Sequence, residues 1–182
     1  MPPPPDAARW HLSAELLASF EGAVAPGGLF AVSGLAELAL HDDTLFVPAF
    51  RLGLVRSASA STELEDGATA SFVWTAALVD ACPLAVRRGA FALMPCLRGE
   101  LGALEGEGER IAPARDATRL WAAVTTLARA SWTFYGPLSL ELGAGARWPL
   151  YRTRFFFQPD TTIYRTPAVG LTVGGGLGLR IL

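Results

Sequence analysis

Hydrophobic and polar residues alternate along this chain with a period of two. Near the start, Leu12 and Leu16 fall on one face of an extended segment. Ser13 and Glu15 fall on the opposite face. Because side chains on a β-strand point to opposite sides in turn, this pattern predicts a strand with one apolar face. A helix would instead place Glu15 beside the apolar stripe.

Eight runs of this kind recur, and all but one span 11 or more residues. They cover residues 10–21, 30–40, 46–57, 71–78, 91–103, 119–132, 138–148 and 169–180. A tilted membrane strand needs about 9–11 residues, and closing the sheet removes the unpaired edges that lipid cannot satisfy. We therefore predict an all-β fold, a closed eight-stranded antiparallel up-and-down transmembrane β-barrel. Residues 9–182 would form the barrel domain, after a Pro-rich N-terminal extension at residues 1–8.

The composition of the two faces indicates which one is outside. The apolar faces are broad and rich in Leu, Val and Phe, whereas the polar faces carry many small residues such as Gly143, Gly145 and Gly174. Small residues suit a narrow lumen, and Gly on an exposed strand would weaken it without benefit. We place the apolar faces against lipid. A soluble lipocalin-like barrel, with its apolar residues inside and an apolar small molecule bound there, is the alternative.

Applied to the fourth and sixth runs, this assignment makes specific predictions. In the fourth run it places four residues on the lipid face: Phe72, Trp74, Ala76 and Leu78. In the sixth run it leaves two bulky residues, Trp121 and Leu127, on the polar face.

The polar faces also carry thinly spaced charges, which would point into the lumen. These residues are Glu15, Glu37, Arg51, Arg98, Glu100, Arg129, Glu141, Arg147 and Arg180. Isolated buried charges are very costly, so carboxylates and guanidiniums should pair. An eight-stranded barrel is barely wide enough for its own side chains. This favours a structural network that fills the lumen over a minor pore.

The apolar content is high but dispersed, with 51% hydrophobic residues and a mean hydropathy of +0.33. The longest charge-free stretches, residues 22–36 and 166–179, are shorter than a membrane-spanning helix and contain Gly and Pro. The 15 basic residues are all Arg and are balanced by 17 acidic ones. No basic surface for nucleic acid is therefore expected.

The first residues, Met1 to Asp6, lack the basic and apolar regions of a signal peptide. An outer-membrane protein needs such a peptide for export. We expect that it has been removed or lies outside this chain.

Two cysteines flank a predicted turn at residues 87–89. In an oxidising compartment Cys82 and Cys96 are candidates for a disulfide. With the faces assigned as above, simple alternation puts them on opposite sides of the sheet, so pairing would need a bulge near Pro83. The two histidines, His11 and His41, are far apart in sequence. We therefore expect no metal site and no cofactor.

Taken together, the strand pattern of residues 9–182 resembles that of the OmpA/OmpX-like family of small outer-membrane barrels. The alternating Gly and apolar residues at 168–182 look like the family's insertion signal. The resemblance implies location in the bacterial outer membrane, insertion by the barrel-assembly machinery, and a structural, adhesive or minor-pore role. It places two long connections, residues 105–117 and 150–167, at the outer surface. Three arginines there are candidates for contact with lipopolysaccharide head groups: Arg152, Arg154 and Arg165.

The leading functional prediction is a monomeric structural or surface-interaction barrel without catalytic activity. Some small outer-membrane barrels modify lipid A, which is a further alternative here. Such an enzyme would use His11 with Ser13, for which the sequence offers no obvious acidic third partner.

Overall fold

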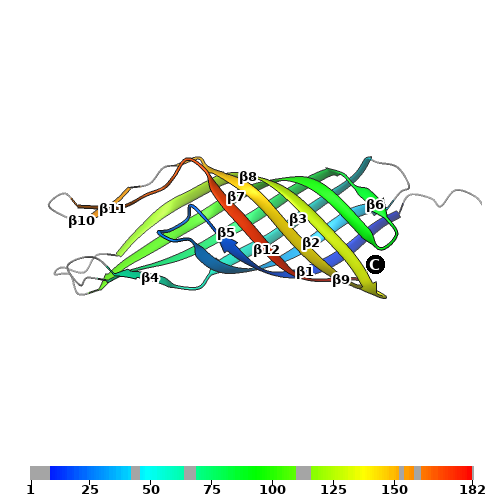
Figure 1. Cartoon of the computed structure of the whole chain (residues 1–182), viewed down its shortest axis with the longest axis horizontal. Coiled ribbons are helices and arrows are strands. Elements are labelled where there is room, and N and C mark those ends of the chain that lie inside the picture. The colour runs from blue at the N-terminus through cyan, green and yellow to red at the C-terminus, as the bar shows by residue number, and fades with distance from the viewer. Residues whose placement is uncertain are drawn as a thin grey trace, which may run out of the picture.

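The computed structural model describes residues 9–41, 46–63, 69–109, 116–151, 154–157 and 161–181. Eight long strands form the barrel (Figure 1): β1 (Arg9–Glu21), β2 (Leu29–His41), β3 (Phe46–Ser57), β5 (Thr69–Leu84), β7 (Phe91–Glu109), β8 (Asp116–Tyr135), β9 (Leu138–Pro149) and β12 (Gly170–Arg180). Four short strands accompany them: β4 (Ala60–Glu63), β6 (Val86–Arg88), β10 (Arg154–Phe157) and β11 (Thr161–Arg165). In the part of the chain so described, no helix is long and apolar enough to cross a membrane.

The strands pair antiparallel in chain order, and the sheet closes on itself. Strand β5 pairs with both β3 and β7, and the first strand pairs with the last. In this closing seam Ser13 lies opposite Arg180, and Glu21 lies opposite Thr172. The predicted closed, eight-stranded, up-and-down topology is confirmed.

The barrel has two different ends. One, the turn end, carries the C-terminus and the tight connections at residues 89–90 and 136–137, where Gly89 and Gly136 adopt positive φ. The opposite end, the loop end, carries the β1–β2 hairpin, the paired ends of β7 and β8 at Glu107 and Asp116, and the small β10–β11 ribbon (Figure 1). In bacterial barrels short turns face the periplasm and longer connections face outward.

Large apolar side chains cover the outside of the barrel. Leu16, Phe30 and Leu54 are 63%, 71% and 67% exposed, respectively. In every run except the fourth, the predicted apolar face is the outer one. A surface of this kind is suited to lipid and not to water, so the soluble-barrel alternative is wrong.

The prediction for the fourth run is wrong, because β5 is inverted. Its larger apolar residues point into the barrel, where Trp74 is 0% exposed, and its smaller ones face outward, where Val79 is 53% exposed. The same parity brings Asp80 inside. A carboxylate in the middle of a strand could not face lipid. Asp80 therefore determines which face of β5 points inward, and this is the opposite of the orientation predicted from side-chain size.

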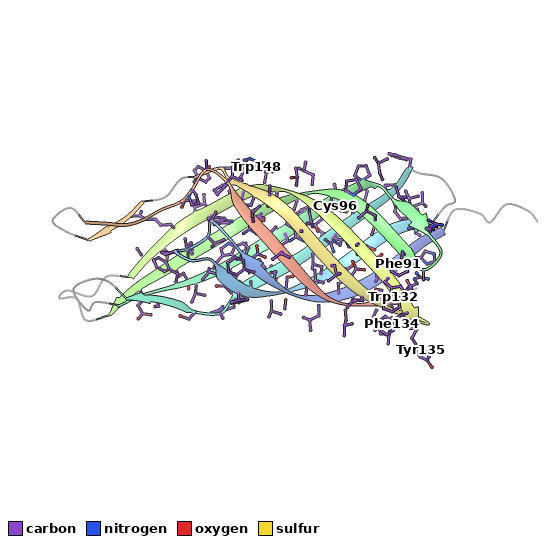
Figure 2. All side chains as sticks on the ribbon, viewed as in Figure 1. Phe91, Cys96, Trp132, Phe134, Tyr135 and Trp148 are labelled. Atoms are coloured by element: carbon purple, nitrogen blue, oxygen red, sulfur yellow. A yellow bond between two sulfur atoms is a disulfide. The ribbon has the colours of Figure 1, made fainter. Side chains whose placement is uncertain are left out.

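Aromatic residues lie at both edges of the apolar belt, including Phe30 and Trp148 towards the loop end. Figure 2 shows Phe91, Trp132, Phe134 and Tyr135 at the turn end, where the rings of Phe91 and Trp132 stack at 5.7 Å. On β7 the outward face is apolar as far as Ala103 and then becomes acidic at 105 and 107. This change places the outer boundary of the membrane-spanning part.

At the loop end the sheet continues past this boundary. Strands β7 and β8 contain 19 and 20 residues, whereas β12 contains 11. They stay paired from Phe91 opposite Trp132 to Glu107 opposite Asp116. Of the predicted loop at residues 105–117, residues 105–109 and 116–117 are therefore strand, and residues 110–115 lie outside the described part of the chain. Alternating Gly and Glu on β7 are polar but do not stop pairing.

The β1–β2 hairpin folds into the mouth of the barrel. Ala23 has a positive φ of 65°, and Val24 and Ala25 are buried. With residues from five strands they form the loop-end cluster: Val24, Ala25, Leu29, Ala31, Leu35, Val55, Phe72, Trp74, Ala76, Leu78, Leu104, Trp121 and Ala123. A second apolar group, the turn-end cluster, comprises Val47, Ala49, Cys82, Ala85, Met94, Cys96 and Leu127. The lumen thus has apolar regions beside its charged layer, and Trp121 and Leu127 lie inside as predicted.

Candidate functional site

A chain of ion pairs crosses the middle of the lumen. Arg98 on β7 donates to Asp80 on β5 at 2.7 Å, and Asp80 also accepts from Arg51 on β3 at 2.5 Å. Arg51 continues to Glu15 on β1 at 2.6 Å. All four side chains are buried. Strands that are not neighbours in the sheet are thereby joined through the interior.

Arg129 on β8 completes this chain by binding three carboxylates. It donates to Glu15 at 2.5 Å, to Glu141 at 2.7 Å and to Glu37. These partners come from β1, β9 and β2, so a single guanidinium links four strands. The seven residues form what we call the central network: Glu15, Glu37, Arg51, Asp80, Arg98, Arg129 and Glu141.

A separate group surrounds Arg147 towards the loop end. Arg147 binds Glu21 at 2.5 Å and Glu100 at 3.0 Å, and its guanidinium lies 5.1 Å from the centre of the Trp74 ring. Glu100 also accepts from the Thr125 hydroxyl at 2.8 Å and from the Trp121 indole at 3.2 Å. Each charge in this group is therefore satisfied by several polar contacts, as burial requires.

Eight of the nine predicted lumen charges belong to these two groups. Arg180 instead lies exposed on the rim of the lumen at the turn end. Asp80 and Glu21 were missed. The position of Asp80 within an apolar strand could have identified it, because a mid-strand carboxylate has to face the lumen. Glu21 lies on the polar face of the first run, so the alternation could have identified it as well.

Two of the three arginines predicted to touch lipopolysaccharide, Arg154 and Arg165, lie on described strands. Arg152 lies outside the described residues. Arg154 and Arg165 face each other in the backbone pairing of the β10–β11 ribbon, and their side chains are not among those described. Residues 1–8 of the predicted extension also lie outside the described part.

Cys82 and Cys96 form a disulfide on adjacent strands, with Cα atoms 4.2 Å apart. Both point into the lumen and are buried. The expected bulge is not needed, because β5 has the opposite orientation from the predicted one. The predicted disulfide is confirmed. The prediction that Cys82 and Cys96 lie on opposite sides of the sheet is wrong.

Two cavities of very different size accompany the network. A void of about 30 Å³, lined by Arg51, Arg98 and Arg129, lies within the charged layer, which is room for about one water molecule. A larger cavity of about 360 Å³ opens at the turn end and reaches Arg129. Among the described residues no three His, Cys, Asp or Glu side chains are grouped so as to hold a metal ion.

Comparison with known proteins identifies the fold. No family model and no curated protein sequence matches the chain. A major outer membrane protein of Thermus thermophilus is 13% identical, with a TM-score of 0.65 over 95% of this chain and 100% of that one. Ail, the attachment invasion locus protein of Yersinia pestis, was solved with the heparin analogue sucrose octasulfate. It is 9% identical, with a TM-score of 0.52 over 96% of this chain and 99% of that one.

Proposed function

We propose that this chain, which has the fold of small bacterial outer-membrane barrels, is a non-conducting barrel that presents its loop end for surface interactions. The outer-membrane location follows from the lipid-compatible outer face and from its structural neighbours. A filled lumen leaves the ends of the barrel as the surfaces on which it can act.

One observation carries this proposal: side chains block the lumen, while the sheet continues past the apolar belt at the loop end. The loop-end cluster and the inward hairpin fill the half of the lumen nearest the loop end, and the central network crosses its middle. Meanwhile β7 and β8 continue beyond the apolar belt as a paired ribbon, with β5 beside them. Because an extended, hydrogen-bonded ribbon is a more rigid platform than a loop, it is suited to recognition.

The part of the β7–β8 ribbon beyond the apolar belt, which we call the ribbon extension, carries mostly acidic and hydroxyl side chains. A surface hollow of about 300 Å³ on it is lined by Ser71, Val73, Glu105, Glu107 and Thr118, among others. The two carboxylates and two hydroxyls favour a partner that offers cationic or hydrogen-bond-donating groups. Ail was crystallised with a sulfated ligand, but these carboxylates disfavour extending that ligand to this chain.

Removing the ribbon extension of β7 and β8 tests the proposed role in surface interactions. In the variant, a two-residue Asn-Gly turn replaces residues 105–118 and connects Leu104 to Arg119, which already face each other across β7 and β8. Bacteria without other adhesins would display either barrel, and their adherence to epithelial monolayers would be counted. We expect adherence with the full barrel to exceed that with the shortened barrel by about tenfold.

Two controls make the result interpretable. Both barrels should show a heat-dependent shift on SDS gels, which demonstrates that each is folded. A Glu105→Gln, Glu107→Gln variant keeps the ribbon and removes the two carboxylates of the hollow, so adherence should fall in it too. Equal adherence of the full and shortened barrels would reject the surface-interaction role.

The same proposal includes the route of assembly and the oligomeric state. We propose insertion by the barrel-assembly machinery, supported by the outward-facing Leu171, Val173, Leu177 and Leu179 of the last strand. We also propose a monomer whose belt contacts outer-membrane lipid and lipopolysaccharide. No catalytic role is proposed, since His11 and Ser13 line the cavity inside the barrel, out of reach of bilayer lipid.

A further inference from the structure

The cavity at the turn end is a built chamber on the opposite side of the molecule from the proposed interaction surface. Its volume of about 360 Å³ is in the range of small-molecule sites. Its lining comes from β1, β2, β6, β7, β8, β9 and β12, and it is closed below by Arg129 and its carboxylates. We call this cavity the vestibule.

The floor of the vestibule is rich in carboxylate oxygens. The central network contains four carboxylates and three guanidiniums, so it carries one unbalanced negative charge. Glu37 and Glu141 line the cavity, and Arg129 is the ion-pair partner of each. An ionised carboxylate offers about four acceptor positions, so both retain capacity for a donor that enters from the cavity.

The rim has the opposite charge. Arg87 on β6 and Arg180 on β12 both line the vestibule, and both are exposed. Arg87 interacts electrostatically with Arg180 and with Glu37 on the floor. Two guanidiniums beside one opening form a site for a carboxylate or a phosphate, which they can bind through paired N–H donors.

Hydroxyl groups line the wall between floor and rim. Ser13 lies directly opposite Arg180, and Thr133 lies opposite Ser139 across β8 and β9. The four hydroxyl residues Ser13, Ser131, Thr133 and Ser139 line the cavity and are partly buried. Hydroxyls both donate and accept hydrogen bonds, so this wall is complementary to the hydroxyls of a sugar.

We propose that the vestibule binds a small zwitterionic polyol, with its ammonium group on the Glu37 and Glu141 floor and its phosphate or carboxylate group at the Arg87 and Arg180 rim. The polarity of the chamber, negative inside and positive at the mouth, sets the orientation of the ligand. An anion alone would meet the carboxylate floor, and a cation alone would have to pass the guanidinium rim.

A matched set of three compounds tests this charge pattern. Glucosamine 6-phosphate carries both charges, glucose 6-phosphate lacks the ammonium group, and glucosamine lacks the phosphate. Their binding to the full chain, folded in detergent micelles, would be measured by titration calorimetry. We expect glucosamine 6-phosphate to bind at least about tenfold more tightly than either of the other two compounds. Equal binding of all three, or no binding of any of them at about 10 mM, would overturn the proposal.

Variants locate the site independently of the loop end. Arg180→Gln should weaken binding of glucosamine 6-phosphate about tenfold and leave that of glucosamine unchanged. Glu37→Gln should reduce binding of glucosamine 6-phosphate towards that of glucose 6-phosphate. Arg56→Gln, which alters an exposed guanidinium on the outer face of β3, is the control and should bind as the unaltered chain does. If the Arg180→Gln and Glu37→Gln variants, folded by the gel-shift criterion, both bound normally, the ligand would lie elsewhere and the proposal would fail.

Discussion

At the scale of single residues, the glycines of β12 are constrained by the neighbouring backbone. A Cβ added at Gly176 would lie 2.0 Å from the carbonyl oxygen of Leu16 on β1. At Gly34, on the outer face of β2, an added Cβ would meet nothing within 4 Å. The small residues predicted to suit a narrow lumen are thus needed in part for a different reason, the close approach of two strands at the closing seam.

This contrast gives a paired prediction. Gly176→Ala should destabilise the folded barrel by about 1–3 kcal/mol, because the seam would have to open to admit the methyl group. Gly34→Ala should have little effect. Urea titration of each variant in lipid vesicles, followed by the fraction of heat-shifted band, measures both. Equal midpoints would show that β12 moves away without cost.

Arg129 is the residue on which the central network depends most. Replacing it by Met should cost about 3–5 kcal/mol, because Glu15, Glu37 and Glu141 would then be buried without it. The same substitution at the exposed Arg56 should change stability by no more than about 0.5 kcal/mol. The comparison uses the same urea titration. An Arg129→Met barrel as stable as the unaltered one would mean that the carboxylates are protonated or hydrated at little cost.

At the scale of elements, β5 shows both the strength and the limit of the sequence pattern. Alternation located the strand, as it located the other seven, because a period of two is a local property of the backbone. Its two faces, however, differ little in polarity, and the larger apolar side chains were assigned to lipid. They pack inside with Val24 and Trp121, and this depends on residues that are distant in sequence. The sequence likewise could not predict which carboxylate pairs with which arginine, because these partners lie far apart along the chain and meet only in the folded barrel.

The disulfide between β5 and β7 should stabilise the hairpin at the turn end. It closes a loop with a sequence separation of 14, for which the chain-entropy estimate is about 3 kcal/mol. Replacing both Cys82 and Cys96 by Ala should lower the unfolding free energy by about that amount and leave the barrel folded. Reducing agent should destabilise the unaltered chain and not the double variant. A response of the variant to reductant would indicate that the effect is not due to this bond.

At the scale of the whole molecule, the filled lumen predicts an electrically silent barrel. Single-channel recordings in planar bilayers should show no discrete steps with the unaltered chain, since apolar side chains and ion pairs occupy the path. Replacing Trp74 and Trp121 by Ala removes two large side chains, whose rings pack at 6.0 Å. We expect brief openings in this variant. Regular steps with the unaltered chain would revive the minor-pore interpretation.

The seam between β1 and β12 also has a consequence for how the protein is made. Every residue of the sheet's closing edge is contributed by the first and last strands of the chain. The contacts that seal the cylinder therefore have the largest sequence separation available, and folding with such contacts is intrinsically slow. The sheet keeps an open edge until β1 and β12 meet. Pairing between neighbouring strands can therefore precede closure, and closure needs both ends of the barrel domain to be in place.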